Sequence, residues 1–182
     1  MQVERLRDRW LAEPEFVADV LISSHYSRAL ETADILAPAL GELPVVVIEG
    51  FGEHDPGEAF DGLHYEELVE KLGPLDRDSD PYILGYPGGE TVADFHYRVG
   101  KTIAETVQQH EGKTIVVTCH GGVVDVALRH ALRTPPTGSF DLWTINTSIT
   151  EFKVVKPGRW RLVRYNDYAH LTGLPGETAS DL

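Results

Sequence analysis

Apolar residues recur along the chain with two spacings, one typical of helices and one typical of buried strands. Near the N-terminus, Val3, Leu6 and Trp10 follow one another at helical intervals, which predicts an amphipathic helix. The apolar run at residues 17–22 predicts a buried strand. The same two patterns predict further helices that begin near residues 27, 64, 91 and 121, and further strands at 45–48, 114–118, 148–155 and 160–165.

The order of these elements indicates the fold class. Strands alternate with helices over most of the chain, which is typical of an α/β protein with a mostly parallel sheet. The last two strands are separated by a short turn at Pro157-Gly158 and should form an antiparallel hairpin. We therefore predict a three-layer α/β/α sandwich in a single domain that covers residues 1–182.

Composition and charge narrow the classes of partner. The net charge of −13 disfavours nucleic acid and anionic membrane surfaces, because both attract basic proteins. No apolar run approaches the roughly 18 residues of a membrane-spanning helix. A single cysteine cannot form an internal disulfide, which favours a reducing, cytoplasmic location. The common zinc-binding spacings are absent from the sequence, so no metal or other cofactor is expected.

Two junctions between a strand and a helix carry residues suited to bind phosphate. Arg28 lies in the first turn of the predicted second helix, where its guanidinium adds to the positive end of the helix. His120 follows the 114–118 strand, and Gly121 and Gly122 after it leave room for an oxyanion beside the backbone N–H groups. Ligands of open α/β sheets bind at the carboxyl ends of strands, so these residues should converge.

The polar loop at residues 49–63 supplies a candidate acid. A carboxyl group such as that of Glu53 could donate a proton to a leaving group if it lay beside the two junctions. Taken alone, the loop also fits an ordinary acidic, solvated surface segment. Cys119 precedes His120, but Asp125 stands where a cysteine phosphatase needs an arginine, so a small buried residue is the simpler interpretation.

The motifs together resemble a known family. The segments S-x-x-x-R-A-x-x-T-A from Ser24, G-G-E ending at Glu90, H-G-G from His120 and N-x-S from Asn146 occur in that order. This series, which runs from about Val20 to Leu171, resembles the histidine phosphatase superfamily, also called phosphoglycerate mutase-like. The resemblance implies hydrolysis of a small phosphomonoester through a phosphohistidine, without a cofactor. It leaves transfer of the phosphoryl group to a second substrate, as in a mutase, as an alternative.

The resemblance also implies a role for each candidate residue. Arg28 would bind the phosphate, together with Ser24 and Gly121. His120 would be the second active-site histidine, and Glu53 would protonate the leaving oxygen. The expected partner is a small phosphorylated substrate or free phosphate, and the sequence leaves a homo-oligomer open.

One motif of that family does not occur in this sequence. The family's R-H-G segment carries the histidine that becomes phosphorylated, and the one histidine followed by glycine here is His120. We therefore expect the N-terminal strand and nucleophile loop to be missing, with an unpaired strand edge next to Ser23 or Thr118, and the chain by itself to be inactive. His25, near Arg28, is a weak substitute because the geometry for attack would be fortuitous.

Two other functions stay open at this point. The first is a non-catalytic relative that binds a phosphorylated ligand. The second is an unrelated metal-dependent hydrolase whose ligands would be drawn from Glu53, His54, Asp55, Asp61 and His64.

Overall fold

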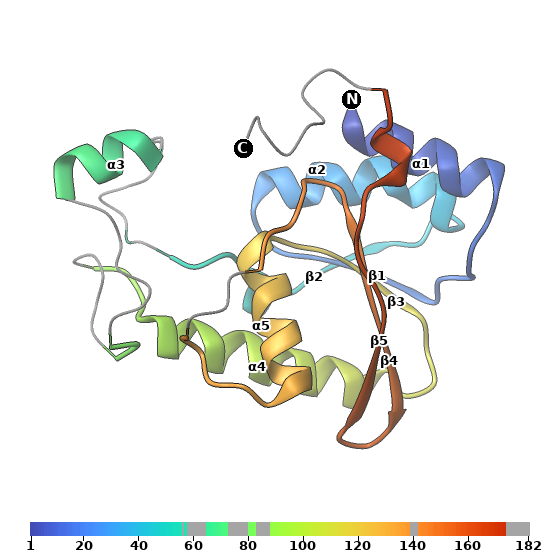
Figure 1. Cartoon of the computed structure of the whole chain (residues 1–182). Coiled ribbons are helices and arrows are strands. Elements are labelled where there is room, and N and C mark those ends of the chain that lie inside the picture. Colours follow the sequence, from blue (N-terminus) through green and yellow to red (C-terminus); the bar gives the residue numbers. More distant parts are fainter. Residues whose placement is uncertain (56, 58–64, 73–79, 83–87, 139–141, 174–182) are drawn as a thin grey trace.

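A computed structural model shows the arrangement of these elements (Figure 1). It describes residues 1–55, 57, 65–72, 80–82, 88–138 and 142–173. The sequence of residues 73–89, rich in proline and glycine, predicts a long loop, and most of it falls outside the described residues. Among the described residues, no helix combines the length and apolar character that crossing a membrane requires.

Three parallel strands form the central sheet. β1 (Val20–Ser23) lies between β2 (Val45–Val47) and β3 (Ile115–Thr118). In the register of β1 and β3, Ser23 lies opposite Thr118, so the two strands end at the same level. This register places the residues that follow both strands side by side at the carboxyl edge of the sheet.

Helices cover both faces of the sheet, as the three-layer prediction requires (Figure 1). α1 (Gln2–Ala12) and α2 (Ser27–Leu36) pack on the face that Leu21 enters. α4 (Val92–Gln109) and α5 (Gly121–Leu132) pack on the opposite face, which receives Ile22. Neighbouring residues of β1 thus enter separate cores, because successive side chains of a strand point to opposite faces. The shorter helical segments are η1 (Ala37–Leu40), η2 (Glu49–Phe51), α3 (Tyr65–Leu72) and η4 (Ala169–Leu171).

The last two strands, β4 (Ile149–Lys156) and β5 (Arg159–Asp167), form the antiparallel hairpin predicted from the sequence. Within the described part of the chain, the hairpin is a sheet of its own rather than an extension of the central sheet. β1 pairs on both edges, whereas β3 pairs only with β1 there. Of the two strands beside which an unpaired edge was expected, β1 is therefore paired on both sides, and β3, like β2, has one edge without a strand among the described residues. That a further segment belongs beside β3 stays a prediction.

Local signals fixed most element boundaries. Thr91 caps α4, because its hydroxyl oxygen accepts a hydrogen bond from the Asp94 N–H at 3.0 Å. Gly41 ends η1 with a left-handed φ of 74°, a conformation that glycine adopts without a steric penalty. The first strand begins at Val20 rather than at Val17, because Val17 is 84% exposed and Asp19 binds the Thr114 N–H and the Lys113 ammonium instead.

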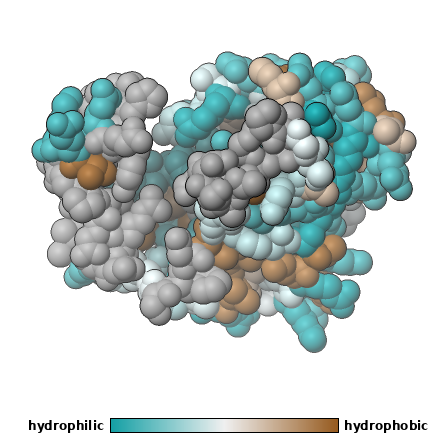
Figure 2. Space-filling model, turned by 45° about the horizontal axis from the view of Figure 1, so that its top comes forward, coloured by the Kyte–Doolittle hydropathy of each residue, from teal (hydrophilic) through white to brown (hydrophobic). Residues whose placement is uncertain are grey.

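Among the described residues, the face in view in Figure 2 is mostly hydrophilic, with hydrophobic residues gathered in smaller areas. One hollow of about 240 Å³ is lined by apolar side chains and Tyr165, between α5 and β5; the other lining residues are Leu128, Leu132, Leu142 and Leu162. None of the residues with candidate chemistry lines it.

Candidate functional site

The parallel register of β1 and β3 brings Ser24 and His120 into direct contact. Ser24 follows β1, and its N–H donates to the Thr118 carbonyl at 3.1 Å, which extends the sheet by one bond. His120 is the N-cap of α5, two residues after β3. The Ser24 hydroxyl and His120 Nε2 are 2.8 Å apart, and both residues are buried. The two strand ends therefore meet as the sequence predicts.

Arg28 joins this pair from the first turn of α2. Its Nε–H donates to His120 Nδ1 at 3.3 Å, so the two side chains are in direct contact. The guanidinium lies over the Tyr26 ring at 4.6 Å, and that ring meets the imidazole of His120 edge-on. Because Nδ1 accepts the bond from Arg28, the proton of a neutral imidazole resides on Nε2 and is donated to Ser24.

Burial keeps His120 neutral. Desolvation and, after it, the positive charge of Arg28 lower its pKa to about 4, although the carboxylate of Glu53 opposes the shift. At neutral pH the imidazole therefore carries one proton, on Nε2. The Nε2–H can donate a hydrogen bond to a phosphoryl oxygen instead of to the Ser24 hydroxyl.

This protonation state can be measured directly. The ring signals of His120 are expected to titrate near pH 4 in an NMR experiment, well below the ordinary histidine value. Arg28→Met should raise that pKa, because the nearest positive charge is removed. Lys101→Met on the exposed side of α4 is the control and should leave it unchanged. Titration of His120 near pH 6.5 in the unmodified chain would contradict the buried, neutral state.

Glu53 approaches the same site from the loop after η2. Its Oε2 accepts the Gly122 N–H at 3.0 Å, and its Oε1 accepts the His54 N–H at 2.8 Å. A Cβ on Gly122 would stand 2.2 Å from Glu53 Oε1, so only glycine admits the carboxylate this close to the first turn of α5. The Gly122 N–H is thus bonded to Glu53. Of the two glycines expected to lie beside an oxyanion, Gly121 is therefore the one that stays a candidate.

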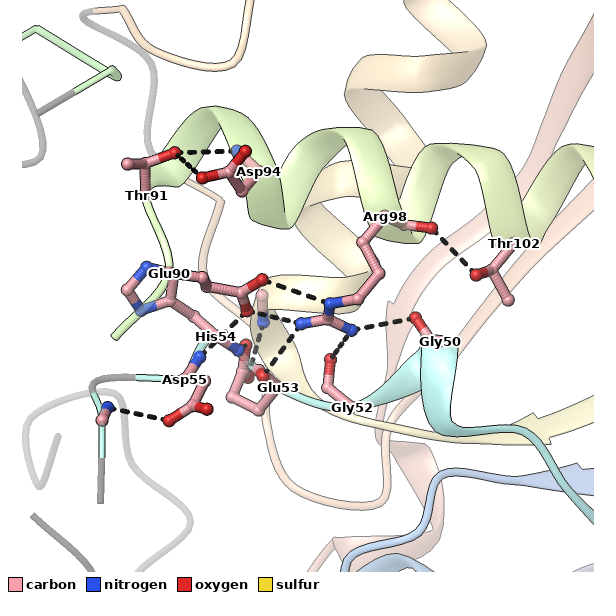
Figure 3. A network of polar contacts seen from close by, with 12 residues as sticks. Gly50, Gly52, Glu53, His54, Asp55, Glu90, Thr91, Asp94, Arg98 and Thr102 are labelled. Atoms are coloured by element: carbon pink, nitrogen blue, oxygen red, sulfur yellow. Dashed lines mark hydrogen bonds and ion pairs between the residues drawn. The ribbon is translucent and has the colours of Figure 1, made fainter. Parts of the chain in front are cut away.

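An arginine that the sequence analysis did not single out holds the Glu53 loop. Arg98 of α4 donates to the carbonyls of Gly50 and Gly52 at 3.1 and 3.2 Å and to the Glu53 carbonyl at 3.3 Å (Figure 3). Its guanidinium is also paired with the carboxylate of Glu90. Glu90 was noticed only as the end of the G-G-E motif, and nothing in the local sequence links either residue to the loop.

The other sequence candidates do not form a second centre in the described residues. Desolvation raises the pKa of the Cys119 thiol to about 12, so it is not a thiolate nucleophile. In the described part of the chain, no three His, Cys, Asp or Glu side chains lie close enough to hold a metal ion. Asp61 and His64, two ligands of the metal-dependent alternative, lie outside the described residues.

Comparison with known proteins identifies a family to which the chain is similar. The model of the histidine phosphatase superfamily (branch 1) matches residues 1–168. Phosphoglycerate mutase-like protein 4 of Arabidopsis thaliana is 29% identical over 93% of this chain and 73% of its own length. Two solved structures cover 93% of this chain. YhfR of Bacillus stearothermophilus has a TM-score of 0.77 at 24% identity over 83% of its length. Phosphoserine phosphatase of Entamoeba histolytica, in complex with 3-phosphoglyceric acid, has a TM-score of 0.72 at 27% identity over 82% of its length.

Proposed function

Because the chain belongs to the histidine phosphatase superfamily, we propose that it carries the phosphate site and the acid of a phosphatase for a small phosphorylated metabolite. The observation that supports this most is the convergence of Arg28, His120 and Ser24 at the carboxyl edge of the sheet. One fixed cation, one neutral imidazole N–H and one hydroxyl suit the tetrahedral oxygens of a phosphate.

Each residue has a distinct part in the proposed reaction. Arg28 turns from His120 to the phosphoryl oxygens, which frees both groups to bind the anion. His120 donates from Nε2 to another oxygen in place of the Ser24 hydroxyl, and that hydroxyl is then free to donate to a third oxygen. In a form that carries the nucleophilic histidine, the phosphoryl group would pass to that histidine as the P–O bond breaks, and the protonated Glu53 would give its proton to the leaving oxygen. The superfamily's histidine nucleophile, which accepts the phosphoryl group before water removes it, is absent from this sequence.

The absence of that nucleophile motif also favours a second candidate function. A chain with the anion site and no nucleophile can bind a phosphorylated ligand without turning it over. The two functions use the same binding residues. A measurement of phosphate binding therefore tests the shared site, and a measurement of turnover distinguishes the phosphatase from the ligand-binding protein.

Binding of inorganic phosphate to the chain tests the proposed site. Arg28→Met is expected to weaken phosphate affinity about 10-fold, because a hydrogen bond to a charged group contributes about 1.5–3 kcal/mol. Isothermal titration calorimetry at low salt gives the affinities, and vanadate is a second probe. Arg7→Met on α1 is the matched control, because Arg7 pairs with the exposed Asp8 instead. Equal affinity in the Arg28 and Arg7 variants would reject the site.

A further inference from the structure

We infer that Arg98 and Glu90 are positioning residues that hold the Glu53 carboxylate against the first turn of α5. The catalytic meaning of this inference rests on the proposed function, in which Glu53 is the acid. The hydrogen bonds of Arg98 and Glu90 described below go to the Glu53 loop and to each other, so both residues act through the loop.

The guanidinium fixes the backbone that leads into Glu53. Nη1 of Arg98 donates to the carbonyls of Gly50 and Gly52, and Nη2 donates to the carbonyl of Glu53 itself (Figure 3). A Cβ on Gly50 would stand 2.0 Å from Thr102 Oγ1, so the loop lies directly on α4. These three carbonyls tie the loop to the middle of a long helix, which is a rigid support.

Glu90 fixes the guanidinium and the far side of the loop at the same time. Its Oε2 accepts Arg98 Nε–H at 3.2 Å, while its Oε1 accepts both Arg98 Nη2–H and the Asp55 N–H, the latter at 3.0 Å. The Glu90 N–H also donates to the Asp55 carbonyl at 2.9 Å. The backbone is therefore held on both sides of Glu53. The carboxylate of Glu90 also neutralises the positive charge of Arg98 beside the carbonyls that Arg98 binds.

The side chain of Glu53 is held at its other end by α5. Its carboxylate accepts the N–H groups of Gly122 and His54. Phe95 of α4 fills the space beside this contact, since a Cβ on Gly122 would also stand 3.1 Å from the Phe95 ring. A carboxylate on an unsupported loop would sample many positions in water, and an acid must meet the leaving oxygen within a few tenths of an ångström. The Arg98–Glu90 pair removes that freedom.

The Gly122 amide offers a direct readout of this contact. Because Glu53 Oε2 accepts the Gly122 N–H, replacing that oxygen's charged group in Glu53→Gln should shift the NMR signal of the Gly122 amide at a fixed pH. The change between the unmodified chain and Glu53→Gln is the part of the shift that belongs to Glu53. We expect Arg98→Met to abolish this Glu53-dependent shift of the Gly122 signal. Arg98→Lys should retain some of the shift, because lysine keeps one donor for the loop. Lys101→Met on the same helix is the control and should preserve the full shift. Glu90→Gln should reduce it and provides the test should Arg98→Met fail to fold.

The outcomes separate this inference from the proposed function. A Gly122 shift that persists unchanged in the folded Arg98 or Glu90 variants overturns the positioning role, whatever the chain binds. A shift lost in Arg98→Met and kept in Lys101→Met supports it, even in a chain that binds no phosphate. Where phosphate does bind, the effect of Arg98→Met on its affinity should vanish in a Glu53→Gln background, because residues that act through one another are not additive. Additive effects would contradict the inference.

Discussion

The 182-residue chain is expected to hydrolyse p-nitrophenyl phosphate at no more than a trace rate. No histidine other than His120 is followed by glycine, so the R-H-G nucleophile is not present in this sequence. His120 is not expected to take its place, because in the proposed reaction its Nε2 carries the proton that is donated to a phosphoryl oxygen, and a protonated ring nitrogen has no lone pair with which to attack. Removal of a covalent nucleophile costs on the order of 10⁴–10⁶ in kcat. A steady-state assay with p-nitrophenyl phosphate and with sugar phosphates measures the residual rate.

His25 is the one histidine near Arg28 that could replace the nucleophile. It is exposed, and its ring lies against the Tyr26 ring with the centroids 4.4 Å apart. A Cβ on Gly52 would stand 2.8 Å from its Cε1, so the imidazole lies over the start of the Glu53 loop. We expect His25→Ala to leave the trace rate unchanged. Robust turnover that His25→Ala abolishes would instead make His25 the nucleophile.

A longer form of the protein provides the positive control. If the reading frame encodes an R-H-G segment upstream, a chain that includes it should be active, and His120→Ala should remove that activity. Activity in the long form alone would support the phosphatase proposal. Inactivity of both forms, together with phosphate binding, would favour the ligand-binding alternative.

The fold was predictable because its signals are local. The apolar spacing of residues 3–10 gives α1, Thr91 gives the start of α4, and the run at residues 114–118 gives β3 within one residue. The strand order could not be read in this way. Which strand lies beside which depends on contacts between segments far apart in sequence, and the periodicity of one strand does not identify its partner.

The candidate site was predictable in part. A residue just after a parallel strand must lie at the carboxyl edge, which is why Arg28, Ser24 and His120 meet as expected. The contact of Glu53 with Gly122 joins segments 69 residues apart, and the sequence shows only that both are suited to it. Arg98 was missed because it binds backbone carbonyls, which every residue has. An arginine that recognises peptide groups leaves no pattern in the side chains of its partner segment.

Asp167→Asn is expected to destabilise the fold by about 2 kcal/mol at neutral pH. Asp167 ends β5, and its carboxylate accepts Arg9 Nη2–H of α1 at 2.8 Å and the Ala169 N–H at 3.1 Å. The bond from Arg9, followed by the other contacts, lowers its pKa to about 2, against 3.8 ordinarily. The side chain is only 23% exposed, so solvent screens this pair weakly. The measurement is urea unfolding followed by circular dichroism at several pH values.

The pH dependence decides whether the carboxylate charge is the cause. A group whose pKa is lowered by folding stabilises the protein above its unfolded pKa, and that contribution disappears as the pH falls through its folded pKa. The difference between the unmodified chain and Asp167→Asn should therefore be full above about pH 4 and shrink towards zero near pH 2. His120, whose pKa is also lowered, affects both curves alike and cancels. Asp8→Asn, 64% exposed on α1, is the control and should change stability by less than about 0.5 kcal/mol. A constant difference across this range would mean that Asp167 acts through shape and hydrogen bonding, without its charge.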